Sequence, residues 1–371
     1  MKYYIIAGEP SGDLHGANLI KGLKKIDHEA EILAWGGEKM QQAGATLRMH
    51  YKHLAIMGFV EVLAHLGTIR NNFNFAKKDI INFQPDVLIT IDFPGFNLRM
   101  AKWAHKKGFA TFHYISPNLW AWKKNRVYQI HKYVDKLFVI LPFEPDFYKD
   151  YNMTVEYEGH PLLDAVHQFE PQSEAVFRSQ CNLSDKPIVA VLPGSRKQEI
   201  SRMLPLMLKV SSNHPEYEYL VAGAPGIDRD FYKKFTEVYP HVKVVHNVTY
   251  DILDKAVAGM ITSGTATLEA ALFNVPQVVC YKTNPVSFAI ARMIVKIRRF
   301  CLVNLIMKED VVTELIQHLM TFNTLNKEFE AILPGYEKHD VVLKKYRELR
   351  KKIGEKGVST RVAQKMYKAL Q

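Results

Sequence analysis

The sequence has no long apolar segment. No stretch approaches the 18 or so consecutive apolar residues that a membrane-spanning helix requires. The first apolar run, Tyr3–Ala7, is followed at once by Gly8 and the acid Glu9. Because this run is too short for the apolar core of a secretory signal, we expect it to form a first β-strand. We therefore predict neither a transmembrane span nor a signal peptide.

Cysteine is also scarce. Cys181, Cys280 and Cys301 are the only three in 371 residues, and their spacing is not that of zinc ligands. An odd, small number excludes a disulfide framework and favours a reducing cytoplasm. The remaining composition, 47% hydrophobic and 23% charged, is that of a globular protein, and 371 residues suit two domains.

Acidic residues are outnumbered, since 49 Lys and Arg face 38 Asp and Glu, a formal net charge of +11. The excess lies in two segments: residues 93–134 hold no acid, and residues 341–371 hold ten Lys and Arg against Glu348 and Glu355. This favours an anionic partner such as a lipid headgroup or a phosphorylated metabolite, while a solvated basic helix face explains the tail equally well. No zinc-finger, RNP or basic heptad pattern is present, so nucleic acid is not an expected partner.

Short apolar or β-branched runs alternate with helix-period segments along the whole chain, which predicts parallel strands with crossover helices. The predicted strands are Tyr3–Ala7, Glu31–Trp35, Val87–Ile91, Ala110–Ile115, Lys136–Ile140, Ile188–Leu192, Tyr217–Ala222, Val242–His246, Gly259–Thr262 and Gln277–Tyr281. Predicted helices of the first half begin near His15, span about Gly58–Asn82 and span Leu98–Lys107.

Turn residues and prolines between Gly159 and Glu174 suggest a linker. The sequence therefore predicts an α/β protein of two Rossmann-like, doubly wound domains, residues 1–160 and 161–340, facing a central cleft. Residues 341–371 form basic helices that pack on the first domain or on a partner chain. Ligands are expected beyond the carboxyl ends of the strands.

Two loops of the second half have the composition of anion sites. Gly194, Ser195 and Arg196 follow one predicted strand, and Ser263, Gly264 and Thr265 follow another, with Glu269 one helical turn further on. Small residues let a pyrophosphate approach a helix N-terminus, Arg196 adds positive charge, and Glu269 can accept hydrogen bonds from ribose hydroxyls. We expect a nucleotide-sugar site here; two coincidental helix caps are the alternative.

The loops of the first half carry carboxylates. Residues 8–17 lack the spacing of a dinucleotide site or a P-loop, and Glu9 and Asp13 would repel phosphate. A sugar-hydroxyl or acceptor-positioning role fits better, and the alternative is a helix start that Ser11 or Asp13 caps. Asp92 ends an apolar strand and suits a general base, although a lone Asp there is as often a helix cap.

Two further segments have aromatic or apolar character. Trp120 and Trp122 precede Lys123, Lys124 and Arg126, which suits a sugar ring or a lipid headgroup; a tryptophan plug in the interdomain core is the alternative. Between Ala55 and Phe75 apolar residues recur at helical spacing, which by default means core packing. A membrane-docking or acyl-binding face is the second interpretation, carried by Ile56, Phe59, Val60 and Leu63.

Five motifs together resemble the lipid-A-disaccharide synthase family over nearly the whole chain: Gly-Glu-Pro-Ser-Gly-Asp at 8–13, Ile-Asp-Phe-Pro-Gly-Phe-Asn at 91–97, Ser-Pro-Asn-Leu-Trp-Ala-Trp at 116–122, Leu-Pro-Gly-Ser-Arg at 192–196, and Ser-Gly-Thr-Ala-Thr-Leu-Glu at 263–269. That family resembles the GT-B glycosyltransferases. It joins UDP-2,3-diacylglucosamine to 2,3-diacylglucosamine 1-phosphate, releasing UDP and forming the β(1→6) disaccharide precursor of lipid A.

The resemblance implies a role for individual residues. Asp92 corresponds to the proposed base, Glu9 to a cleft residue, Arg196 to a donor-phosphate contact and Glu269 to a ribose contact. Asn304, Glu314 and Gln317 also match family cleft positions. The family often carries a second Asp where this chain has Gly95, so only a mechanism that rests on Asp92 is carried over.

The resemblance also implies a setting. It implies no cofactor, an anionic membrane surface as partner, and a peripheral position on the cytoplasmic face of the inner membrane, with the 55–75 helix as docking surface. It implies pairing of two copies through the carboxyl-terminal helices. An α-linked donor and a β-linked product require one in-line displacement with inversion, in which the donor loops stabilise departing UDP without a metal ion.

Two other functions compete. A UDP-N-acetylglucosamine 2-epimerase resembles the same two-domain plan, but it gives no reason for the apolar 55–75 face or the acid-free basic segment. A non-enzymatic peripheral protein that binds anionic lipid through the basic tail leaves both predicted phosphate sites without a purpose.

Overall fold

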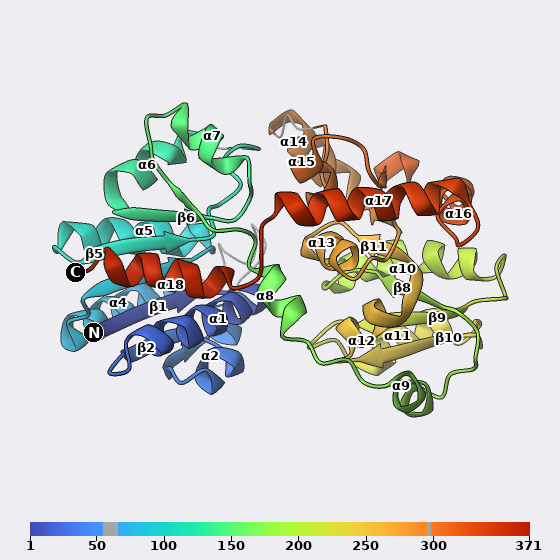
Figure 1. Cartoon of the computed structure of the whole chain (residues 1–371), viewed down its shortest axis with the longest axis horizontal. Helices are drawn as coiled ribbons and strands as arrows, with labels where there is room; N and C mark the ends of the chain where they lie inside the picture. Colours follow the sequence, from blue (N-terminus) through green and yellow to red (C-terminus); the bar gives the residue numbers. More distant parts are fainter. Residues whose placement is uncertain (55–65, 123, 295–297) are drawn as a thin grey trace. The chain divides into compact units, whose positions relative to one another are not determined.

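The computed structural model describes residues 1–54, 66–122, 124–294 and 298–371 (Figure 1). The chain forms two compact units: unit 1 comprises Met1–Ala165 and Gly354–Gln371, and unit 2 comprises Val166–Ile353. Each unit is built on one parallel sheet with helices packed against it. The prediction of two Rossmann-like α/β domains is confirmed.

The sheet of unit 1 has seven strands in the order β3-β2-β1-β4-β5-β6-β7. β1 lies between β2 and β4, so the strand order reverses there, and the carboxyl ends of β1 and β4 flank the switch point at which open α/β sheets bind ligands. The side chains of β4 are all buried, as expected of a central parallel strand. The strands are β1 Lys2–Ala7, β2 Glu31–Gly36, β3 Thr46–His50, β4 Val87–Ile91, β5 Ala110–Tyr114, β6 Lys136–Val139 and β7 Glu156–Tyr157.

The helices of unit 1 are α1 Pro10–Ile26, α2 Glu38–Gln42, α4 Leu66–Phe83, α5 Pro94–Lys106, α6 Arg126–Tyr133, α7 Glu144–Lys149 and α18 Val358–Lys368, with a 3-10 turn at Tyr51–His53. α8, Leu162–His167, lies at the boundary of the units. α1 and α5 start earlier than the sequence predicted, because Pro10 and Pro94 occupy the first helical turn, where proline is favoured.

The proposed cap of α1 is wrong. The residue before α1 is Glu9, and no side chain caps that helix. Asp13 is buried and instead accepts hydrogen bonds from the backbone N–H groups of Gly37, Lys39 and Met40, at 2.7, 3.2 and 3.1 Å. These groups lie at the start of α2, so Asp13 caps a neighbouring helix.

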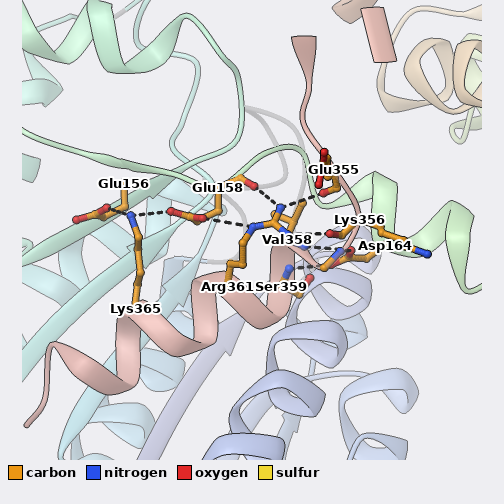
Figure 2. A network of polar contacts seen from close by, with 10 residues as sticks. Glu156, Glu158, Asp164, Glu355, Lys356, Val358, Ser359, Arg361 and Lys365 are labelled. Carbon is orange, nitrogen blue, oxygen red and sulfur yellow. Dashed lines mark hydrogen bonds and ion pairs between the residues drawn. The ribbon is translucent and has the colours of Figure 1, made fainter. Parts of the chain in front are cut away.

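α18 returns to unit 1 and lies beside α1 (Figure 1). Gly22 of α1 permits this approach, since a Cβ there would lie 3.0 Å from the Cβ of Ala363. Figure 2 shows the polar contacts: the Asp164 carboxylate accepts the N–H groups of Gly357, Val358 and Ser359 at the start of α18, and Lys365 pairs with Glu156 and Glu158 at 2.6 Å. Part of the basic tail is thus paired within unit 1.

The sheet of unit 2 has six strands in the order β10-β9-β8-β11-β12-β13, with the switch point between β8 and β11. The strands are β8 Ile188–Leu192, β9 Glu218–Gly223, β10 Val242–His246, β11 Ala256–Thr262, β12 Gln277–Tyr281 and β13 Thr313–Ile316. The helices are α9 Glu174–Cys181, α10 Lys197–Ser211, α11 Arg229–Thr236, α12 Thr249–Lys255, α13 Thr265–Leu272, α14 Pro285–Ile294, α15 Leu302–Met307, α16 Phe322–Ala331 and α17 Glu337–Lys352, with a 3-10 turn at Gln317–Leu319.

Every predicted strand is present, with ends shifted by up to three residues. β3, β7 and β13 were not predicted, because each is a partly exposed edge or near-edge strand without a continuous apolar run.

The described part of the helix predicted over residues 58–82 is α4, which begins at Leu66. Ala76 and Ile80 pack in the core with Trp35, and Phe73 stacks on Phe96 at 4.2 Å. Ile56, Phe59, Val60 and Leu63 lie outside the described residues. None of the described helices is long and apolar enough to cross a membrane.

Candidate functional site

Asp92 follows the last residue of β4 in an unusual backbone conformation. Its φ is +44° and that of Phe93 is +49°, both in the left-handed region that residues other than glycine seldom adopt. The N–H of Asp92 donates to the oxygen of Tyr114 at the end of β5, at 3.0 Å. This turn ends the strand and starts α5 two residues later. Such local strain is characteristic of functional sites.

Asn97 holds this turn, a role that the sequence analysis did not assign. Its buried side-chain amide nitrogen lies 2.7 Å from the oxygen of Asp92, 3.0 Å from that of Ile91 and 3.3 Å from that of Ile6. One side chain therefore ties the carboxyl ends of β1 and β4 together. Its position in the first turn of α5, five residues after Asp92, was the available signal.

Gly8 brings the β1 loop against the β4 turn. A Cβ at Gly8 would lie 2.4 Å from the ring of Phe93, so no other residue fits without displacing that ring. Glu9 follows directly and is partly exposed, as is Asp92. Burial, and secondly the nearby carboxylate of Glu9, raise the pKa of Asp92 to about 6. The structure thus brings together the two carboxylates that the sequence analysis selected.

The loop after β5 supplies aromatic rings at the same edge of the sheet. Trp120 packs edge-on against Phe143, with ring centroids 5.2 Å apart. Its indole N–H is buried and has no hydrogen-bond partner among the described residues. Trp122 is 38% exposed, and Arg126 is the first residue of α6. Lys123 lies outside the described residues.

Glu144, which the sequence analysis missed, is buried at the first position of α7, after β6. One carboxylate oxygen accepts the N–H groups of Ile140 and Leu141 at 3.1 and 2.8 Å, and the other has no hydrogen-bond partner among the described residues. Burial raises the pKa of Glu144 to about 7. Nothing in the sequence pattern distinguished it from an ordinary acid in the first turn of a helix.

In unit 2, the loop after β8 turns sharply at Gly194, whose φ is +118°. A Cβ at Gly194 would lie 2.7 Å from a carboxylate oxygen of Glu199. That carboxylate accepts the N–H of Ser195 at 3.3 Å and pairs with the guanidinium of Arg196 at 3.2 Å. Arg196 precedes α10 and is 61% exposed. The loop thus holds a cation directly before a helix N-terminus.

The loop after the adjacent strand, β11, also ends in a helix start. Gly264 precedes α13 with a φ of +153°, no side chain caps the helix, and a Cβ at Gly264 would meet nothing within 4 Å. Ser263 and Thr265 flank it. Glu269 accepts a hydrogen bond from Tyr250 at 2.9 Å, and burial raises its pKa. Because β8 and β11 are parallel neighbours, the loops that follow them both lie at the carboxyl ends of the strands.

The remaining predicted donor residues connect elements within unit 2. The side chain of Asn304 is buried, donates to the oxygen of Val312 and to Glu314 at 2.8 Å, and accepts the N–H of Val312. Glu314 also accepts the N–H groups of Phe300 and Cys301 before α15. Gln317 accepts the N–H of Thr283 at 2.7 Å, just beyond β12. These residues shape the region around β12 and β13.

Comparisons with known proteins agree on fold and family. Among solved structures, a UDP-GlcNAc 2-epimerase from Neisseria meningitidis bound to UDP-GlcNAc is 12% identical, with a TM-score of 0.70 over 99% of this chain and 100% of that chain. The glycosyltransferase of kitacinnamycin is 13% identical, with a TM-score of 0.69 over 100% and 99%. At these identities the likeness shows the fold alone, which is that of the GT-B glycosyltransferases.

Sequence relatives are nearer. A lipid-A-disaccharide synthase from Koribacter versatilis is 36% identical over 94% of this chain and 92% of its own length. One from Coxiella burnetii is 34% identical over 98% and 97%, respectively. The family model described as lipid-A-disaccharide synthetase matches residues 3–366. The chain therefore belongs to the lipid-A-disaccharide synthetase family, whose members are glycosyltransferases of lipid A synthesis.

Proposed function

We propose that the chain transfers the diacylglucosaminyl group of UDP-2,3-diacylglucosamine to the 6-hydroxyl of 2,3-diacylglucosamine 1-phosphate, with inversion at the anomeric carbon. The observation that carries this proposal is the Asp92 turn. A partly buried carboxylate with a pKa raised to about 6 is held rigidly at the switch point of the unit 1 sheet. Such a group is mostly ionised at neutral pH and still basic enough to take a proton.

Asp92 is assigned the role of general base. As the acceptor 6-oxygen forms its bond to the anomeric carbon, the bond from that carbon to the UDP oxygen breaks, and the hydroxyl proton passes to the Asp92 carboxylate. A positioned base of this kind contributes roughly 10²–10⁴-fold to the rate. Glu9 tunes Asp92 through its charge, and the unpartnered indole N–H of Trp120 is available to an acceptor hydroxyl.

Unit 2 is assigned the donor. Its two neighbouring helix starts, Ser195–Arg196 and Ser263–Thr265, offer backbone N–H groups and a guanidinium to the diphosphate of UDP. Negative charge on the UDP oxygens grows in the transition state, so preorganised donors stabilise the transition state more than the ground state. Glu269 is assigned to the ribose hydroxyls, with Asn304, Glu314 and Gln317 maintaining the surrounding wall.

Both substrates carry acyl chains, so we place the chain on the cytoplasmic face of the inner membrane as a peripheral protein. The acid-free segment 93–134 of unit 1, with eight Lys and Arg residues, supports contact with an anionic membrane surface. Pairing of two chains through the carboxyl-terminal helices remains part of the proposal.

The decisive experiment measures UDP release from the UDP-linked diacyl sugar, with and without the diacyl sugar 1-phosphate. We expect release only when both lipids are present, and a disaccharide with a β(1→6) linkage by NMR. Asp92→Asn should keep the wild-type unfolding midpoint and UDP affinity but lose at least about 100-fold in kcat. Turnover of UDP-N-acetylglucosamine to its 2-epimer, or no UDP release at all, would refute the proposal.

A further inference from the structure

We propose that unit 2 carries a second lipid contact, a cavity of about 480 Å³ that binds the phosphate headgroup of an anionic membrane phospholipid. The cavity is lined from α14, from the segment before α15, from α15 itself, from β13 with the residues on either side of it, and from α17. Asn304 and Glu314, which the proposed function places in the wall around the donor, also line it, whereas none of the residues of the two donor helix starts does. The proposed function assigns membrane contact to unit 1 only, so a lipid contact on unit 2, next to the proposed donor wall, goes beyond it.

The sequence around this cavity is depleted of acid. Residues 270–308 contain no Asp or Glu, a stretch comparable to residues 93–134 of unit 1, and they include Lys282, Arg292, Lys296, Arg298, Arg299 and Lys308. A segment of this length without acid concentrates positive potential on the surface that it forms.

Two of the cationic side chains that line the cavity have no acidic partner among the described residues. Its cationic side chains are Arg292, Arg298, Arg299 and Lys338, and its acids are Asp310 and Glu314. Arg299 pairs with Asp310 at 2.6 Å, and Lys338 pairs with Glu328 at 2.6 Å.

Glu314 is occupied as well, since it accepts hydrogen bonds from the backbone and from Asn304. Arg292 and Arg298 are exposed, and neither makes a hydrogen bond or ion pair with the residues that the structure describes. A phosphate would supply the counter-charge that both guanidinium groups lack, in the bidentate geometry that arginine favours.

The surroundings of these cations suit a phosphate that is attached to an apolar body. Phe288 and Phe300 line the cavity beside Arg292 and Arg299. Met293, next to Arg292 in α14, is 80% exposed, the largest exposure among the large hydrophobic residues that the structure describes. Cations beside exposed apolar side chains are the composition of a surface that rests in the headgroup region of a bilayer. Binding of a free phosphate would not explain why an apolar side chain, Met293, is exposed beside these cations.

The test measures partition of the full chain onto vesicles of phosphatidylcholine, with and without phosphatidylglycerol, by sedimentation. The variant R292Q/R298Q is compared with R229Q/K327Q, which removes two exposed cations from α11 and α16 of the same unit and so lowers the net charge equally. A cation at an anionic membrane contributes roughly five-fold to binding. We therefore expect R292Q/R298Q to bind phosphatidylglycerol vesicles roughly 30-fold more weakly, and R229Q/K327Q to change binding by less than about three-fold.

Met293→Gln should weaken vesicle binding while leaving the salt dependence of that binding unchanged.

Equal losses of vesicle binding in the two double variants would mean that only net charge matters and would overturn the proposal. Phosphate that releases the chain from vesicles at far lower concentration than chloride, at equal ionic strength, would identify a free-phosphate site and also overturn it. A raised Kd for UDP in R292Q/R298Q with unchanged vesicle binding would instead make the cavity part of the donor site. UDP release is measured separately, so the two proposals fail independently.

Discussion

Asn97 fixes the main chain at Asp92: the side-chain amide of Asn97 donates to the carbonyl oxygen of Asp92 over 2.7 Å. The same nitrogen reaches the oxygens of Ile6 and Ile91, so it joins the two strands at the switch point. The strained turn that carries the proposed base therefore depends on a buried amide that itself lies outside the chemistry.

Replacing Asn97 by Ala should show whether this residue positions Asp92 for catalysis or only stabilises the fold. Loss of the amide leaves buried carbonyl oxygens without a donor, which should lower the free energy of unfolding by about 1–3 kcal/mol. Because a displacement of about 1 Å can cost on the order of 100-fold in rate, kcat should fall by roughly 10–100-fold with little change in UDP affinity. Urea unfolding and initial rates check this. A destabilised variant with wild-type kcat would show that Asn97 supports the fold only.

The rate should follow the ionisation of Asp92. Its pKa is raised to about 6, so the base is protonated and inactive below that pH, and kcat/KM should fall about tenfold per pH unit there and level off above. Glu9→Gln removes the charge of the neighbouring carboxylate, which should move this limb to lower pH. Rates of UDP release between about pH 5 and 8 test both statements. A limb that stays in place in Glu9→Gln would contradict the coupling of the two carboxylates.

Gly8→Ala should disturb Phe93. The new Cβ would lie 2.4 Å from that ring, and overpacking of this kind costs about 1–3 kcal/mol. Because Phe93 adjoins Asp92, kcat should fall as well. Gly95→Ala is the matched control, since a Cβ there meets nothing within 4 Å. Equal melting temperatures and rates for the two variants would show that the contact of Gly8 with Phe93 is unimportant.

Glu144 should make stability decrease with rising pH. Its pKa is raised to about 7 in the folded chain, above the 4.5 of an unperturbed Glu, so the folded state holds the proton more tightly. The stability from this group is present below about pH 4.5 and is lost as the pH rises through about 7. Glu144→Gln keeps an oxygen for the two N–H groups without the charge, so it should be more stable than the wild type by on the order of 1–3 kcal/mol at pH 8. Denaturant midpoints at pH 5 and pH 8 measure the difference, and a variant that is less stable at pH 8 would contradict it.

Asp164 should be required for docking of α18. Asp164→Ala leaves the N–H groups of Gly357, Val358 and Ser359 without their acceptor, which should cost about 2–4 kcal/mol. Asp150, exposed at the end of α7, is the control, and Asp150→Ala should stay within about 0.5 kcal/mol of the wild type. Limited proteolysis should cut the Asp164 variant first near Gly354, whereas an unchanged cleavage pattern would show that the carboxylate does not secure the helix.

Local pattern predicted much of this molecule. The central strands, such as Val87–Ile91 and Ile188–Leu192, were located without error because buried parallel strands are continuous apolar runs. The segments with Asp92, Arg196 and Ser263 were selected because small residues and charges follow those runs directly, and the roles of these residues stay predictions. Edge strands such as β13 were not predicted, since a strand that is half exposed has no continuous apolar run.

What the sequence alone determined is the alternation of strands and helices, and hence which residues stand at the carboxyl edge of each sheet. Only the tertiary structure decided which partners those residues have. A cap of its own helix was one of two roles considered for Asp13, and Asp13 instead caps another helix. Asn97 binds the oxygen of Ile6 and Asp164 binds the start of α18, backbone groups far away in the sequence. The physical reason is that a buried polar group must find a partner wherever packing supplies one, and packing brings together residues far apart in the chain.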